Sequence, residues 1–154
     1  MRERRPAAWR TLVVLAAAGA LLQGCAKTEE PSRGPATVYS ADLRGGAARC
    51  AAPDKLTPAA GQPTEARLVV GNDGGWCAVT VAAPGDEPFA AGLLTARPQH
   101  GRVYIHTVGY ATRIDYTPAR GYAGPDAFAV ELLPGGAALR VSVTVQPPGA
   151  APKA

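Results

Sequence analysis

The chain has few of the residues that carry enzymatic or metal chemistry. Its 154 residues include two histidines and three cysteines. The histidines, His100 and His106, are six positions apart without an accompanying carboxylate or thiol cluster, whereas a zinc site needs three or four ligands. The few serines do not lie in a Gly-x-Ser-x-Gly elbow, and no Gly-rich loop opens a helix to hold phosphate. We therefore expect no catalytic residue, no cofactor and no metal.

The sequence also lacks a concentrated positive charge. The net charge is +4, but residues 1–24 carry four arginines and one glutamate, which leaves 12 basic and 11 acidic side chains from Cys25 onward. Binding to nucleic acid requires a basic face that contacts phosphates. A nucleic-acid partner is therefore excluded, while 47% hydrophobic and 18% charged residues favour a folded domain over a disordered chain.

No segment after residue 24 shows the 3.6-residue period of a helix. Fifteen prolines and 18 glycines favour short strands joined by tight turns. From about residue 37 the chain is predicted to form strands, most clearly where apolar residues alternate with polar ones. These segments are residues 64–70 and 76–81 around a turn at 71–75, a hairpin of 102–107 and 112–116, a strand through Phe128, and residues 139–145. The predicted fold class is all-β.

The first 24 residues lack an apolar run long enough to span a bilayer. The apolar run, residues 11–22, is twelve residues long, whereas a helix that spans a bilayer needs about 20. A basic start followed by a short apolar run is typical of a secretory signal peptide. The tetrapeptide Leu22-Gln23-Gly24-Cys25 resembles the lipobox of bacterial lipoproteins. The resemblance implies a diacylglycerol on the Cys25 sulfur, cleavage before Cys25 and acylation of the new amino group. An ordinary thiol after a plain signal peptide is the alternative.

The expected organisation is a signal peptide at 1–24, a lipid-anchored tether at 25–36, a β-sandwich at 37–147 and a disordered tail at 148–154. A flexible ten-residue tether has an end-to-end distance of roughly 17 to 19 Å, so the domain is expected close to the membrane. Ala26 stands where the lipoprotein signal for inner-membrane retention has Asp. The resemblance therefore implies the bacterial cell envelope, at the periplasmic face of the outer membrane.

Two cysteines remain after Cys25 is assigned to the lipid. An even number of cysteines in an exported protein favours a disulfide between Cys50 and Cys77. Closing that loop is expected to stabilise the domain by roughly 3 kcal/mol. Two separate buried thiols are the alternative, and a redox role lacks the Cys-x-x-Cys motif.

Residues 97–133 carry a longer motif. They read Pro-x-x-Gly-x-Val at 98–103, followed by Tyr-x-Pro-x-x-Gly-Tyr-x-Gly-x-Asp-x-Phe at 116–128. This resembles the signature of bacterial Ig-like, cadherin-like modules. The resemblance implies an Ig-like antiparallel β-sandwich used as a spacer or adhesive module, without catalytic residues. We interpret six of these positions as a structural turn between two sheets: Tyr116, Pro118, Gly121, Gly124, Asp126 and Phe128. Asp126 is expected to cap the turn rather than bind calcium, because calcium needs six to eight oxygens.

Two functions remain open for such a module. The first is protein–protein interaction or structural support at the envelope, with an envelope protein as the partner. The second is binding of a cell-wall glycan by exposed aromatic side chains, for which the candidates are Trp76, Tyr104, Tyr110 and Tyr122. Most of these aromatics are equally compatible with packing in the core or in a turn.

Overall fold

The computed structural model describes residues 34–149. The predicted signal peptide, Cys25, most of the tether and most of the tail lie outside these residues. The described elements, in chain order, are a 3-10 helix η1 (Ser40–Leu43) and the strands β1 (Cys50–Ala51), β2 (Thr64–Gly71), β3 (Cys77–Val81), β4 (Ala91–Ala96), β5 (Gly101–Val108), β6 (Ala111–Pro118), β7 (Gly124–Leu133) and β8 (Ala137–Gln146). Among residues 34–149, no helix has the length and apolar character needed to cross a membrane.

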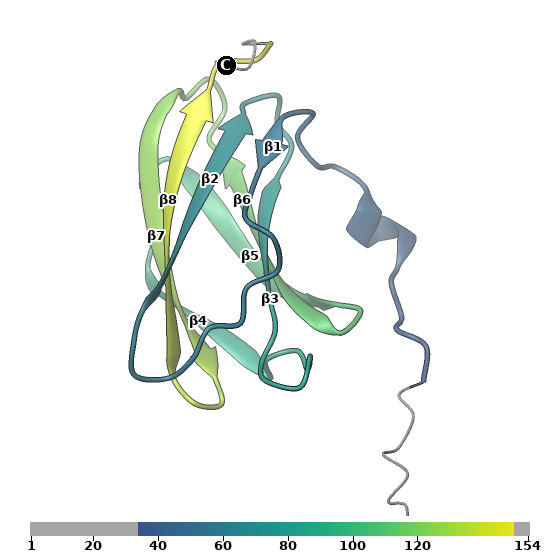
Figure 1. The fold of residues 1–154 in the computed structure, drawn as a ribbon. Helices are drawn as coiled ribbons and strands as arrows, with labels where there is room; N and C mark the ends of the chain where they lie inside the picture. The colour runs from purple at the N-terminus through teal and green to yellow at the C-terminus, as the bar shows by residue number, and fades with distance from the viewer. Residues whose placement is uncertain (1–33, 150–154) are drawn as a thin grey trace, which may run out of the picture. The chain divides into compact units, whose positions relative to one another are not determined.

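The strands form two packed sheets, which confirms the all-β sandwich (Figure 1). One sheet has the order β1-β2-β8-β7-β4, and the other has the order β3-β6-β5. Most neighbouring strands are antiparallel, and β5 and β6 form the predicted hairpin. The exception is β2, which pairs in parallel with β8 over eight residues, from Thr64 opposite Leu139 to Gly71 opposite Gln146.

The core lies between the two sheets and follows from the two-residue period of the strands. In β8 the odd-numbered residues are buried, while Arg140, Ser142 and Thr144 face solvent. The core combines apolar side chains of both sheets: Ala66, Leu68, Val70, Phe128, Val130, Leu132, Leu139, Val141, Val143 and Val145 from the larger sheet, and Cys77, Val79, Val81, Ile114 and Tyr116 from the smaller one. Residues 119–123 carry the chain from β6 in one sheet to β7 in the other, as the Gly- and Pro-rich sequence predicts.

The predicted disulfide is confirmed. Cys50 and Cys77 are bonded, with their Cα atoms 5.2 Å apart. This bond ties the short edge strand β1 to β3 in the opposite sheet.

The prediction that strands begin near residue 37 is wrong. Residues 37–47 contain only η1 and one isolated bridge at Gly46, and the first long strand starts at Thr64. We call residues 37–47 the strap, because they lie along the outer face of the β3-β6-β5 sheet. Edge strand β4 was not predicted, because its sequence, AGLLTA, does not alternate between apolar and polar residues.

Candidate functional site

The four candidate aromatic residues do not gather into one exposed platform. Only Tyr104, on the outer face of β5, is largely exposed, whereas Trp76, Tyr110 and Tyr122 are each half-buried. Tyr110 lies in the turn between β5 and β6. Trp76 lies just before β3, and its indole N–H donates to the Arg44 carbonyl of the strap at 2.9 Å.

Tyr122 belongs to residues 119–123, which pass from one sheet to the other and which we call the crossing segment. Its side chain makes two contacts. Its ring stacks on His100 with the centroids 3.9 Å apart, and its hydroxyl donates to the Pro125 carbonyl at 2.6 Å. The Asn72 amide donates to the carbonyls of Ala119 and Tyr122, at 2.7 and 2.8 Å. These contacts fasten the crossing segment to the turn after β2.

Asp126 makes the side-chain to backbone hydrogen bonds expected of a turn cap. Its carboxylate accepts the backbone N–H groups of Gln99, His100 and Ala127, each at 2.9 Å. It also accepts the Tyr116 hydroxyl at 2.8 Å. Burial acts to raise the pKa of Asp126, but these hydrogen bonds stabilise the ionised form and bring the pKa below its ordinary value. One carboxylate therefore joins the turn before β5, the end of β6 and the start of β7.

Tyr116 is fully buried and explains the glycine at position 101. A Cβ atom built on Gly101 would lie 2.4 Å from the Tyr116 ring, so the ring packs directly on the backbone of β5. Burial, followed by the neighbouring Asp126 carboxylate, raises the pKa of the Tyr116 hydroxyl far above its ordinary value. The Pro-x-x-Gly part of the motif and its Tyr-x-Pro part thus meet at one packed junction.

The described residues outside this junction contain a second polar cluster, on the outer face of the smaller sheet. Arg113 and Asp115 lie on the central strand β6 with little exposed surface. The Arg113 guanidinium donates to both Asp115 oxygens, through Nε at 2.8 Å and Nη2 at 3.1 Å. Its central carbon also lies 4.1 Å from the centroid of the Trp76 ring, within the range of a cation–π interaction.

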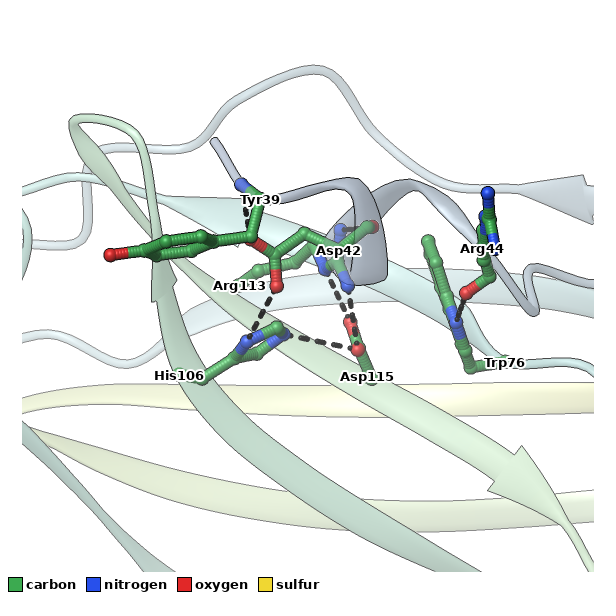
Figure 2. Close-up of polar contacts among 7 residues, drawn as sticks. All are labelled: Tyr39, Asp42, Arg44, Trp76, His106, Arg113 and Asp115. Carbon is green, nitrogen blue, oxygen red and sulfur yellow. Dashed lines mark hydrogen bonds and ion pairs between the residues drawn. The ribbon is translucent and has the colours of Figure 1, made fainter. Parts of the chain in front are cut away.

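The strap covers this cluster and is fastened to it by polar contacts (Figure 2). Arg113 Nη1 donates to the Asp42 carbonyl of η1, and Gly109 N–H donates to the Thr37 carbonyl at 3.2 Å. At the other end, the Trp76 backbone N–H donates to the Gly45 carbonyl at 3.0 Å, and the Trp76 carbonyl accepts from Ala47 N–H at 2.8 Å. No residue of η1 is buried. Hydrogen bonds and charge, rather than an apolar seam, therefore hold η1 on the sheet.

His106 completes the cluster from strand β5. Its Nε2 is 3.1 Å from an Asp115 oxygen, and its Nδ1 is 3.7 Å from an Asp42 oxygen. The imidazole thus lies between the two carboxylates (Figure 2). Every buried side-chain nitrogen and oxygen among the described residues has a hydrogen-bond partner. Within residues 34–149, no group of three or more His, Cys, Asp or Glu side chains is placed to hold a metal ion.

The sequence did not point to this cluster. Arg113 and Asp115 alternate with buried residues, which is the ordinary pattern of side chains facing water. The strap residue that Arg113 contacts, Asp42, is 71 positions earlier in the chain. One feature of the sequence could have indicated the cluster: charged residues alternate with the core residues Ile114 and Tyr116 on one strand. This alternation indicates a covered polar pair only when β6 is known to be the central strand of its sheet.

Compared with known proteins, the chain matches no family model, and none of the curated proteins matches it. The site is therefore interpreted from its own geometry.

Proposed function

We propose that this chain is a lipid-anchored protein of the bacterial envelope, at the periplasmic face of the outer membrane. Its Ig-like module supports or contacts a partner protein there. The single observation that carries the proposal is a disulfide-closed β-sandwich whose N-terminal strap starts twelve positions after the lipobox cysteine, from Cys25 to Thr37. Disulfides persist in oxidising compartments such as the periplasm, which agrees with export by the predicted signal peptide.

The strand order supports the Ig-like part of the proposal. If β2 to β8 are lettered A to G, the sheet β4-β7-β8 is C-F-G, and the sheet β3-β6-β5 is B-E-D. Ig domains of the constant type place A, B, E and D in one sheet and C, F and G in the other. The difference is strand A, which pairs in parallel with G in this chain. The packing of Tyr116 on Gly101 and its hydrogen bond to Asp126 give three signature positions a structural role, which supports the proposal.

Solvent-facing positions of both sheets allow the partner hypothesis to be tested. A photo-crosslinking amino acid placed at Ser142, on the outer face of β8, or at Tyr104, on the outer face of β5, samples the two faces separately. We expect one face to enrich a single envelope protein from intact cells. Recovery of the same abundant proteins from both positions would refute a specific partner.

The anchor is tested by mass spectrometry of the mature N-terminus. Lipidation predicts a chain that begins at Cys25 and carries acyl chains. An unmodified Cys25, or cleavage at another position, would remove the anchor from the proposal. The exposure of the four aromatics does not favour glycan binding, because Tyr104 is the only one of them that is largely exposed.

A further inference from the structure

The large apolar side chains that the described residues expose are concentrated on the strap and beside it. There are five: Val38, Tyr39, Leu43, Leu93 and Tyr104, with exposed fractions of 45%, 69%, 73%, 50% and 63%. Three of them belong to the strap. Single exposed apolar residues are normal on protein surfaces, whereas several in one area mark an interaction site.

Tyr104 adjoins the strap through the polar cluster. Its ring centroid is 4.6 Å from that of His106, and His106 reaches Asp42 of the strap. The Asp42 carboxylate in turn accepts the backbone N–H of Tyr39 at 3.0 Å, while the Tyr39 ring points away from the cluster (Figure 2). We call Val38, Tyr39, Leu43 and Tyr104 the strap face.

The way the strap is attached explains why these side chains are exposed. η1 binds the sheet through its backbone carbonyl and the Asp42 carboxylate, so its apolar side chains are not needed for packing. Leaving Leu43 almost three-quarters exposed gives no benefit to an isolated domain, since burial of such a side chain is worth about 1.5 to 3 kcal/mol. Residues 34–149 do not supply an apolar environment for these side chains.

We propose that the strap face docks on the surface of the bilayer that holds the lipid anchor. This inference rests on the proposed function, because the anchor supplies the proximity. The strap begins at Thr37, twelve positions after Cys25. Twelve residues reach roughly 40 Å at most even when fully extended, which keeps the strap near the bilayer that holds the anchor.

The composition of the strap face suits a bilayer interface. Tyrosine is enriched at membrane interfaces because its ring is apolar and its hydroxyl remains hydrated. Two exposed arginines accompany these side chains: Arg44 follows η1, and Arg102 lies two residues from Tyr104 on the same face of β5. Basic residues beside apolar ones favour anionic headgroups. The bilayer contact therefore combines aromatic, aliphatic and basic groups.

The test uses the mature protein reconstituted in vesicles of phosphatidylcholine and anionic phosphatidylglycerol with brominated acyl chains. Trp9 falls in the predicted signal peptide, so Trp76 is the only tryptophan of the mature chain. A Leu43→Trp variant adds a reporter on the strap face. Leu93→Trp is the matched control, because Leu93 is a similarly exposed leucine on β4 in the other sheet. We expect brominated lipid to reduce the added emission of the Leu43 variant at least about twofold and that of the Leu93 variant little. The quenching should weaken in neutral vesicles.

Vesicle flotation, measured on the same samples, separates failure of the docking from failure of the anchor. Protein that floats without preferential quenching of Leu43→Trp overturns the docking and leaves the anchor intact. Protein that does not float overturns the anchor. In that case each variant is titrated with excess vesicles, and preferential quenching of Leu43→Trp over Leu93→Trp still supports the docking, whereas equal quenching overturns it. A crosslink from Tyr104 to one protein in place of lipid would also overturn the docking, because a protein would then occupy the strap face.

Discussion

Among the described residues, truncation of Asp126 to alanine is predicted to be one of the substitutions that lower the stability of the domain most. Replacing it with alanine removes four hydrogen bonds at once, three from backbone N–H groups and one from the Tyr116 hydroxyl. The hydroxyl keeps only a longer contact, 3.3 Å, to the His100 carbonyl. The change therefore loosens the turn before β5 and leaves a buried tyrosine hydroxyl poorly bonded.

The expected loss follows from the number and exposure of these bonds. A hydrogen bond to a charged group contributes about 1.5 to 3 kcal/mol. The bonds to Gln99 and Ala127 are solvent-exposed, so water replaces much of their contribution after the substitution. We expect Asp126→Ala to lower the free energy of unfolding by about 3 kcal/mol, a large part of the 5 to 15 kcal/mol typical of a domain. Asp126→Asn keeps one accepting oxygen and should lose about 2 kcal/mol.

Equilibrium denaturation in urea, followed by the fluorescence of Trp76, measures these losses. At a typical urea dependence, 3 kcal/mol moves the midpoint by about 2 M. Asp54→Ala is the matched control, because Asp54 is exposed in a loop, and its effect should stay within about 0.5 kcal/mol. An Asp126→Ala midpoint indistinguishable from that of the control would refute the assigned role of this carboxylate.

The same site predicts how stability depends on pH. The pKa of Asp126 is lower in the folded protein than its ordinary value of 3.8. Ionised Asp126 therefore contributes its full stabilising free energy above about pH 5. This contribution is lost as the pH falls through the pKa that Asp126 has in the folded protein. The stability difference between the wild type and Asp126→Asn should be constant near neutral pH and shrink below about pH 4. A difference that persists unchanged in acid would contradict this assignment.

Three further predictions concern other parts of the sandwich. Replacing Cys50 and Cys77 with alanine should cost about 3 kcal/mol, and a reductant should shift the urea midpoint of the wild type alone. Gly101→Ala places a methyl group against the Tyr ring of β6 and should cost about 3 kcal/mol or more, whereas Gly46→Ala meets only ordinary contacts and serves as its control. Arg113→Met leaves the buried Asp115 carboxylate with His106 as its one remaining side-chain partner and should cost about 3 kcal/mol. It should also expose the strap to limited proteolysis, and a strap that stays protected would refute its role as the fastening residue.

The sequence predicted those parts of the fold that local patterns control. Alternating apolar residues identified β8 and the buried face of β7, and the glycines and prolines after Tyr116 placed the passage between the sheets. The disulfide followed from the number of cysteines. Each of these inferences uses residues that are close in sequence or a count over the whole chain.

The strap and its cluster were not predictable in the same way. Four residues of 3-10 helix are too short for a periodic pattern, and no residue of η1 is buried. Arg113 looks like a solvent-facing residue until the strap is placed over it, and no local rule pairs it with Asp42. Predicting this site required knowing which strand is central and which face remains uncovered, and both are properties of the assembled sandwich.

The parallel pairing of β2 with β8 has a mechanical consequence. Force applied between the start of β2 and the end of β8 acts along the strands, so the ladder is loaded in shear and its bonds resist together. Cys50 precedes β2 and is bonded to Cys77, so a pull from the N-terminal side first reaches β3 in the opposite sheet. The covalent bond thus takes residues 51–76, which include β2, out of the path of such a pull, so the β2–β8 ladder is loaded only by forces applied to β2 itself. If the N-terminus is anchored as proposed, a pull from the membrane loads the strap before it reaches the disulfide and the sandwich.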